Sequence, residues 1–257
     1  HVPLAASPAF RGKSELGLFG DVIMELDWSI GEIMKELDRH HLTSQTLLII
    51  TSDNGPWLRY GEHAGSSGGL REGKGSAWEG GTRVPCIIRW PGRVKAGAIN
   101  SELLTNMDLL PTIVTLTGAS LPKNKIDGLD FSNMLLGKTG KGPREVFYYY
   151  YDVNSLKAVR YKNWKLVLPH RSQSYALNIP GQEGYPGEVA QVDVKMALYN
   201  LSHDPGETYD VQQLYPEIVK KMMALAEQAR QDLGDDLTKR KGNNIREAAT
   251  IVDAPGK

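Results

Sequence analysis

The sequence predicts an α/β fold in two parts, and the first part is indicated by a helix followed by a strand. Apolar side chains recur every three or four positions over residues 14–40, the spacing of one helical face. An unbroken apolar run over residues 46–51 follows, typical of a strand buried on both faces. Helix and buried strand together are half of a crossover unit, so we expect a mostly parallel sheet.

The second part is indicated by a change of pattern beyond Gly128. Aromatic and β-branched runs separated by turns favour a small antiparallel sheet of four strands, at residues 147–151, 156–161, 164–168 and 197–201. A helix should begin at Pro216, which is well placed as a first helical residue. We therefore expect residues 1–137 to be part of a large α/β domain. Residues 138–257 should form a small α+β domain with a polar tail.

The chain between these two signals contains a loop, a strand and a helix. Residues 53–82 hold nine glycines and no apolar period, which predicts a long loop of the kind that is usually functional or disordered. Residues 84–90 predict a second buried strand. Thr105 or Asn106 can cap a helix over residues 107–117, which Gly118 ends.

Composition limits the possible partners and compartments. Lys and Arg total 30, Asp and Glu total 30, and the pI is about 7.2, so neither nucleic acid nor a membrane surface is expected as a partner. Cys86 is the only cysteine, so no internal disulfide can form. The chain opens on His1 with no signal peptide before it, as a processed product or a part of a longer protein would.

Two oxygen-bearing side chains follow the first predicted strand. Asp53 and Asn54 lie in the run Thr51-Ser52-Asp53-Asn54-Gly55-Pro56, and ligands of open α/β sheets bind outside the carboxyl ends of strands. Carboxylate and amide oxygens suit a hard cation such as Ca²⁺ or Mg²⁺. The alternative is a plain turn, since Asn-Gly and Gly-Pro are turn formers.

A lysine between two glycines lies further along the loop. Gly73 and Gly75 would let the backbone approach a ligand closely, and the Lys74 ammonium can neutralise an oxyanion. The spacing from Gly68 to Lys74 matches a P-loop, but Gly75 stands where Ser or Thr should hold Mg²⁺ and no strand leads in. The alternative is an ordinary solvated lysine.

Several motifs, in order, resemble those of sulfatases of the arylsulfatase A type. The central block of that family is matched by Gly61–Pro91 with Ser52–Pro56 before it; flanking matches are His1–Leu4, Gly20–Asp27, Leu109–Thr112, Asp127–Phe131 and Leu198–Glu207. The resemblance implies the alkaline-phosphatase-like α/β fold. This chain would supply the second half of its large, mostly parallel sheet and the small α+β domain.

The resemblance also implies roles for individual residues. Asp53 and Asn54 would be two of four protein side chains that hold Ca²⁺, with Mg²⁺ possible. Lys74 would contact the sulfate and the bridging ester oxygen, and His1 would hydrogen-bond a sulfate oxygen. Family members use a formylglycine nucleophile made from Cys or Ser in a Cys/Ser-x-Pro-x-Arg motif. Its hydrate attacks sulfur, the alcohol leaves, and the aldehyde re-forms as sulfate is expelled.

The nucleophile motif is absent from these 257 residues. Cys86 has no proline two residues on, and Ser120 has the proline but Asn124 in place of the arginine. We expect the formylglycine and the other metal ligands to lie in a missing amino-terminal half, and this chain alone to be inactive. The family implies a secretory compartment, either the bacterial periplasm or exterior, or the lysosome.

Other interpretations remain open at this stage. His63, in the glycine-rich loop, and His170, just past a predicted strand, could line a pocket for a sulfated small molecule or glycan. Isolated histidines are more often surface or packing residues. One rival function is a phosphate-ester hydrolase of the alkaline phosphatase superfamily. A second is a non-catalytic chain that binds sulfated glycans. The substrate and the oligomeric state are not predicted.

Overall fold

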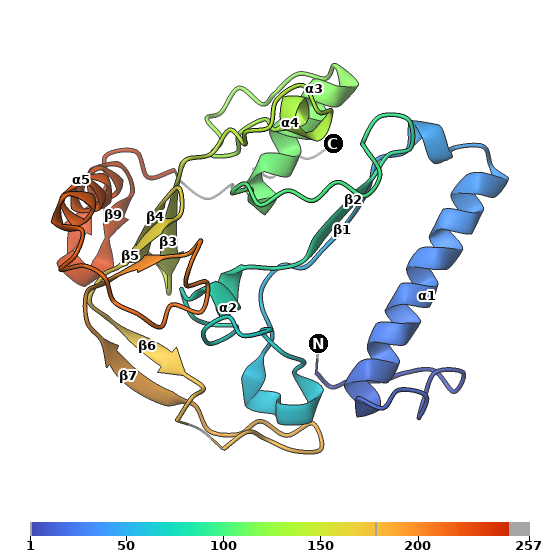
Figure 1. Cartoon of the computed structure of the whole chain (residues 1–257), viewed down its shortest axis with the longest axis horizontal. Coiled ribbons are helices and arrows are strands. Elements are labelled where there is room, and N and C mark those ends of the chain that lie inside the picture. Colours follow the sequence, from blue (N-terminus) through green and yellow to red (C-terminus); the bar gives the residue numbers. More distant parts are fainter. Residues whose placement is uncertain (1, 178, 247–257) are drawn as a thin grey trace, which may run out of the picture.

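The computed structural model describes residues 2–177 and 179–246, and its elements are arranged in three regions (Figure 1). Helix α1 (Gly17–Arg39) stands on one side, and a small sheet with helix α5 (Pro216–Leu233) lies on the other. Residues 53–82, called the glycine-rich segment below, include the short helix α2 (Glu79–Thr82) and lie between them. Among the described residues, no helix has both the length and the apolar composition needed to cross a membrane.

The first predicted helix and strand are present, but the sheet around them differs from the prediction. After α1, a 3₁₀ turn η1 (Thr43–Gln45) leads into β1 (Leu48–Thr51), which pairs with β2 (Cys86–Arg89). The pairing is antiparallel, with Leu48 opposite Arg89. The prediction of a mostly parallel sheet is therefore wrong for the described residues. A crossover needs a strand before the helix, and residues 2–16 form turns and bends instead.

A helix with a capped start follows the antiparallel β1–β2 ribbon. The 3₁₀ turn η3 (Asn106–Asp108) runs into α3 (Leu109–Thr117), and Thr105 and Asp108 form a capping box at its start. Gly118 ends α3 at a φ of 71°, as predicted for a left-handed cap. The Asp108 carboxylate, fully buried, pairs with the Arg144 guanidinium and accepts the Leu129 amide at 2.7 Å. These bonds hold the segment with α4 (Ser132–Leu135) against α3.

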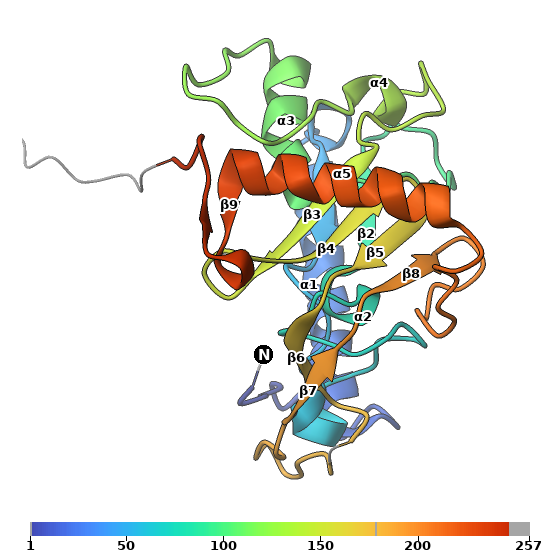
Figure 2. The ribbon, with the colours of Figure 1, turned by 90° about the vertical axis from the view of Figure 1, so that its left-hand side faces the viewer.

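The predicted four-stranded antiparallel sheet is present. Its strands are β3 (Val146–Tyr151), β4 (Ser155–Tyr161), β5 (Trp164–Val167) and β8 (Ala197–Asn200), in the order β3-β4-β5-β8. Helix α5 covers one face (Figure 2), where Met222 and Ala226 pack with Leu156 and Leu166. The other face receives Trp78 of the glycine-rich segment. Both faces are therefore buried, which accounts for strands of almost continuous apolar and aromatic residues.

Two short sheets were not predicted. Strands β6 (His170–Ser174) and β7 (Ala190–Val194) form a hairpin, and β9 (Gly234–Asp235) pairs with β10 (Arg240–Lys241) next to the 3₁₀ turn η4 (Asp236–Thr238). Strands β6, β9 and β10 are polar or only two residues long, so they carry no apolar strand pattern. Strand β7 does alternate apolar and polar residues, at Ala190, Val192 and Val194, and that short signal was missed. Likewise, the predicted long loop over residues 53–82 contains two short helices, η2 (Leu58–His63) and α2. The proposed limit at residues 137 and 138 stays a prediction.

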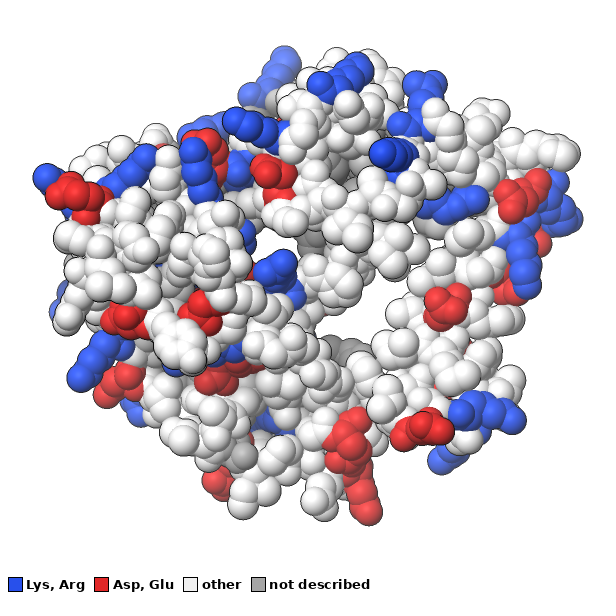
Figure 3. Space-filling model, in the orientation of Figure 1, with Lys and Arg blue, Asp and Glu red and all other residues white. Residues whose placement is uncertain are grey.

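The β1–β2 ribbon and α1 carry apolar side chains that face outward. Ile87 of β2 is 60% exposed and Cys86 is also exposed, so the prediction that this strand is buried is wrong. Ile33 and Trp28 of α1 are each 52% exposed. Figure 3 shows an opening between α1 and the central segment, with charged side chains of both signs spread over the face in view. The described residues that pack against α1 and β2 are too few to cover the apolar side chains of these two elements.

A buried ionic cluster joins the glycine-rich segment to the small sheet. The Lys165 ammonium, on β5, is fully buried and lies 3.1 Å from a Glu79 oxygen and 2.8 Å from a Glu207 oxygen. The Tyr149 hydroxyl donates to Glu79 at 3.1 Å, and the Arg160 guanidinium lies 3.6 Å from the other Glu79 oxygen. The Glu79 amide donates to Glu207 at 2.7 Å. Three separate stretches of chain thus meet at one set of charges.

The charges in this cluster stabilise one another. Burial favours the neutral amine, yet Tyr149, Glu207 and Glu79 raise the pKa of Lys165 above its ordinary value. Burial likewise favours the neutral acid, but Lys165 and Arg160 hold the pKa of Glu79 below its ordinary value. Burial raises the pKa of Glu207. The positive charge of Lys165 therefore makes the largest contribution to keeping the Glu79 carboxylate ionised.

Replacing Lys165 with Met should lower the free energy of unfolding by about 3–5 kcal/mol, because it leaves two carboxylates buried without the ammonium between them. Denaturant titration followed by circular dichroism would measure the loss. Lys162→Met is the matched control, since Lys162 and its partner Glu145 are 54% and 61% exposed and such pairs contribute little. Equal losses in the two variants would contradict the role assigned to the cluster.

Candidate functional site

The Asp53–Asn54 turn leaves the end of β1, as predicted. Asp53 is exposed, and one of its oxygens accepts the Asn54 amide at 2.9 Å. The Asn54 side-chain amide donates to the Gly55 carbonyl at 2.9 Å, so its own oxygen points elsewhere. The second Asp53 oxygen and the Asn54 side-chain oxygen accept no hydrogen bond from the described residues. Both oxygens are available as ligands for a cation.

Backbone contacts bring the Lys74 loop next to this turn. The Gly55 amide donates to the Gly81 carbonyl at 3.0 Å, and the Lys74 amide donates to the Pro56 carbonyl at 2.9 Å. A Cβ on Gly55 would lie 1.8 Å from the Gly80 oxygen, and one on Gly73 would lie 2.5 Å from the Pro56 oxygen. The glycines around Lys74 therefore admit neighbouring segments of the chain. Our expectation that they let the backbone approach a ligand stays a prediction.

The Lys74 side chain extends from this packed loop. Its ammonium lies 5.0 Å from the centre of the Trp57 ring, a cation–π distance. No carboxylate of the described residues forms an ion pair with it, in contrast to the Lys165 ammonium. Lys74 thus carries a positive charge with no carboxylate partner among the described residues, on a loop whose backbone is bonded to Pro56. That arrangement suits the attraction of an anion.

The end of β6 also reaches the Lys74 loop, and sequence reasoning missed it. The Tyr175 hydroxyl donates to the Lys74 carbonyl at 2.5 Å. A Cβ on Gly75 would lie 2.8 Å from the Gln173 side-chain oxygen. Polar residues a hundred positions away give no pattern that links them to Lys74. Only the fold of the β6–β7 hairpin brings them there.

The two predicted pocket histidines lie in different places. His63 ends η2, and its buried Nδ1 has no hydrogen-bond partner within residues 2–177 and 179–246; it lies close to Gly184. His170 begins β6; its Nδ1 lies 2.7 Å from the Leu168 carbonyl, and its buried Nε2 has no partner among the described residues. Neither forms a described hydrogen bond with Asp53, Asn54 or Lys74. His1 lies outside the described residues.

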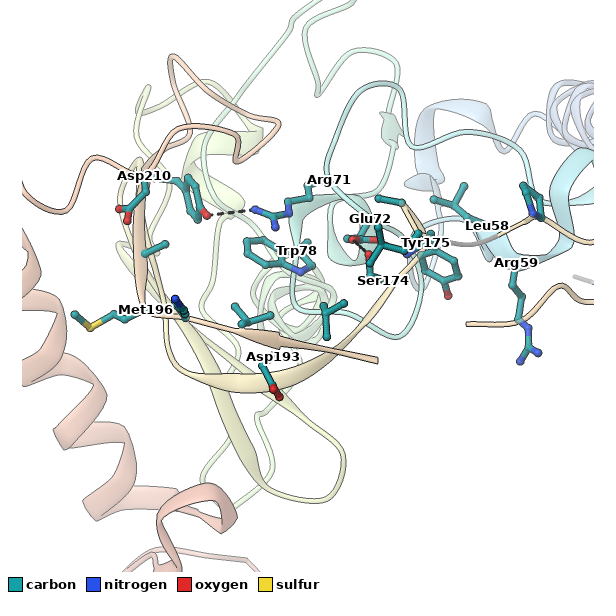
Figure 4. Close-up of a pocket in the computed structure, with 18 of the residues that line it drawn as sticks. Leu58, Arg59, Arg71, Glu72, Trp78, Ser174, Tyr175, Asp193, Met196 and Asp210 are labelled. Carbon is teal, nitrogen blue, oxygen red and sulfur yellow. Dashed lines mark hydrogen bonds between the residues drawn. The ribbon is translucent and has the colours of Figure 1, made fainter. Parts of the chain in front are cut away.

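A groove of about 1120 Å³ runs beside the hairpin, between β7, η2 and the glycine-rich segment (Figure 4). Most of its lining is apolar, and Trp78, Tyr175 and Met196 contribute to it. Two pairs of its polar groups bond to each other: Arg71 donates to the Tyr199 hydroxyl at 3.2 Å, and the Ser174 hydroxyl donates to Glu72 at 2.8 Å. Of the predicted site residues that the structure describes, none lines this groove.

The described residues contain no group of three or more His, Cys, Asp or Glu side chains that could hold a metal ion. The Asp53–Asn54 turn offers one carboxylate and one amide oxygen, both hard donors of the type that Ca²⁺ and Mg²⁺ prefer. The turn fits part of such a site. Ca²⁺ takes about six to eight oxygens, so two side chains cannot complete one.

Comparison with known proteins identifies two family models along the chain. Residues 1–119 match the model described as Sulfatase, and residues 73–232 match the one described as N-sulphoglucosamine sulphohydrolase, C-terminal. Arylsulfatase A of Bos taurus is 35% identical over 89% of this chain. An N-acetylgalactosamine-6-O-sulfatase of Bacteroides thetaiotaomicron is 36% identical over 90% of it. The chain covers 45% of each of these relatives, so it spans about half of their length.

Solved structures give the same result. PsFucS1 sulfatase from Pseudoalteromonas sp. superposes with a TM-score of 0.75 at 29% identity, over 90% of this chain and 46% of that one. A second protein, solved in complex with its substrate D-glucosamine-2-N,6-O-disulfate, matches at a TM-score of 0.59 and 25% identity, over 82% of this chain and 39% of that one. The fold is therefore that of sulfatases, which is alkaline-phosphatase-like.

His170 should titrate below the ordinary histidine value of 6.5, because burial lowers its pKa. The unfolded chain takes up the proton first as the pH falls, so the contribution of His170 to stability is complete above about 6.5 and is lost below it. Imidazole NMR titrations of the folded and the urea-unfolded chain would compare the two pKa values. A folded value equal to or above the unfolded one would contradict the buried, neutral imidazole.

Proposed function

Because the chain belongs to the sulfatase family and is similar to arylsulfatase A, we propose that it supplies part of an active site that hydrolyses sulfate monoesters of aryl or carbohydrate groups. One observation carries the proposal. The Lys74 ammonium is not paired with any described carboxylate, and backbone hydrogen bonds hold its loop against the Asp53–Asn54 turn. These contacts support a shared site for the Lys74 side chain and the two hard oxygen donors near the end of β1.

Lys74 suits the chemistry of the leaving group. A sulfate monoester carries negative charge on its oxygens, and the ester oxygen gains more charge as its bond to sulfur breaks. An alkoxide leaves poorly unless a proton or a positive charge meets it, which the ammonium provides. The Trp57 ring and the partly buried position of Lys74 reduce its exposure to water. Its charge therefore acts more strongly on the substrate than a solvated lysine would.

Asp53 and Asn54 would hold a Ca²⁺ ion, or Mg²⁺, through the two oxygens that accept no described hydrogen bond. Such an ion supplies positive charge to the sulfate oxygens. The Asp53 carboxylate contributes the charge that retains the ion, and Asn54 contributes a neutral ligand. We propose that the remaining ligands and a formylglycine nucleophile come from residues outside these 257, since no Cys/Ser-x-Pro-x-Arg motif occurs among them.

The substrate that we propose is a sulfated small molecule or glycan. Two similar proteins support this: a sequence relative is named as an N-acetylgalactosamine-6-O-sulfatase, and a protein of similar fold was solved with a disulfated glucosamine as its substrate. We also propose a secretory compartment, on the family resemblance. His1 would bind a sulfate oxygen, while His63 and His170 stay candidates for contacts with the rest of the substrate.

Lys74→Ala should lower kcat by about a hundredfold or more and raise KM much less, because charge on the leaving oxygen develops mainly in the transition state. The test joins these 257 residues to a formylglycine-bearing segment and measures hydrolysis of an aryl sulfate. The 257 residues alone serve as the control and should show no turnover. A higher KM with unchanged kcat would contradict the role of Lys74.

The same assay separates the rival functions. Faster turnover of a phosphate monoester than of the sulfate would favour a phosphate-ester hydrolase. Binding of a sulfated glycan without turnover of any ester would favour a non-catalytic binding chain. Either result would overturn the proposed function.

Calcium binding should depend on Asp53 more than on Asn54. In the joined protein, Asp53→Ala removes a charge bound directly to the ion and should abolish metal retention and activity, whereas Asn54→Ala removes a neutral oxygen and should weaken both less. The 257 residues alone should bind Ca²⁺ weakly or not at all. Calorimetric titration of both proteins measures this. Tight binding by the 257 residues, lost in Asp53→Ala, would show that the remaining ligands do not lie outside them.

A further inference from the structure

The loop that carries Lys74 is held from two sides. On one side, the Pro56 carbonyl accepts the Lys74 amide at 2.9 Å. On the other side, the Tyr175 hydroxyl donates to the Lys74 carbonyl at 2.5 Å. Both polar groups of the Lys74 residue backbone are thus bonded to chain segments outside the loop. The lysine side chain extends from a backbone that has little freedom to move.

Glu72 fastens the end of β6 to the same loop. Its two carboxylate oxygens accept the Ser174 hydroxyl at 2.8 Å and the Tyr175 amide at 2.6 Å (Figure 4). Glu72 has a φ of 58°, a left-handed conformation that is uncommon for residues other than glycine. Such a conformation persists where the surroundings hold it. The two hydrogen bonds from the hairpin provide that hold, and they place the Tyr175 ring beside Lys74.

We propose that Glu72 and Tyr175 are positioning residues for Lys74, which fix the backbone from which its ammonium reaches the ester oxygen. The proposal rests on the proposed function, in which Lys74 contacts the sulfate ester. The β6–β7 hairpin then belongs to the active site, although its residues do not touch the reacting atoms. Glu72 anchors the hairpin to the loop, and Tyr175 holds the Lys74 carbonyl.

The chemistry of Tyr175 agrees with this role. Burial raises the pKa of Tyr175 to about 12, so its hydroxyl keeps the proton that it donates to Lys74 at any physiological pH. Position matters because a lysine stem is flexible, and a misplacement of about 1 Å at a reacting group can cost on the order of a hundredfold in rate. The hydrogen bond restricts one end of that flexible chain.

The activity test compares two tyrosines of the same hairpin in the protein joined to a formylglycine-bearing segment. Tyr175→Phe removes only the hydroxyl and should lower kcat on the order of tenfold, with KM changed less than about twofold. Tyr185→Phe is the control, since Tyr185 is 75% exposed, and it should leave both constants unchanged. Unaltered kcat in Tyr175→Phe, with wild-type turnover intact, would overturn the inference.

Glu72 gives a graded series. Glu72→Gln keeps one side-chain oxygen as an acceptor, whereas Glu72→Ala removes both. kcat should fall in the order wild type, Glu72→Gln, Glu72→Ala, at melting temperatures that stay above the assay temperature. Wild-type kcat in Glu72→Ala would show that the hydrogen bonds from Ser174 and Tyr175 do not position Lys74.

Hydrogen exchange of the 257-residue chain tests the positioning without activity. The Lys74 amide should exchange about two- to tenfold faster in Tyr175→Phe, the effect of losing one neutral hydrogen bond, and at the wild-type rate in Tyr185→Phe. Unchanged exchange in Tyr175→Phe would overturn the positioning role. Faster exchange, together with a wild-type joined protein that has no turnover, would support the positioning and reject the proposed function.

Discussion

The buried Lys165 ammonium is the group on which the arrangement of this protein depends. It lies between Glu79 of the glycine-rich segment and Glu207, which follows β8, and the three side chains are fully buried. Desolvating three charges is costly, and their attraction offsets the cost only when the geometry is close to ideal. The cluster therefore specifies where the glycine-rich segment sits on the sheet. Apolar contacts, such as that of Trp78 with the sheet face, add stability but would tolerate a small displacement of the glycine-rich segment along the sheet.

The position of the candidate site follows from that cluster. Glu79 begins α2, and Gly80 and Gly81 of the same helix touch the Glu72 and Gly73 carbonyls and the Gly55 backbone. These contacts are so close that no side chain would fit between them. The cluster of three charges at Glu79 is thus connected, through closely packed backbone segments, to the Asp53–Asn54 turn and to the Lys74 backbone. Rigid support of this kind is what a site needs in order to hold charges in place.

Local patterns predicted much of the fold and some of the candidate site. The helix over residues 17–39, the Thr105 cap, the Pro216 helix start and the four strands of the small sheet all follow from periodicity and turn chemistry, which act over a few residues. The pairing direction of β1 and the exposure of β2 did not follow. Strand direction and burial depend on which segments pack alongside, and an apolar run does not record that. The contribution of Gln173 and Tyr175 was missed for the same reason.

By itself, the sequence determined the sulfatase family and the residue types at the candidate site, since Asp53, Asn54 and Lys74 lie in motifs whose order along the chain is specific. Only the tertiary structure decided that the glycines around Lys74 admit neighbouring segments of the chain. It also decided which charged side chains have a partner of opposite charge among the described residues. Lys165 and Lys74 are both lysines among apolar or aromatic neighbours, yet one is paired with two carboxylates and the other with none among the described residues. That difference arises from contacts between residues far apart in the chain. Their distances are set by packing and electrostatics of the whole fold, and no local pattern encodes them.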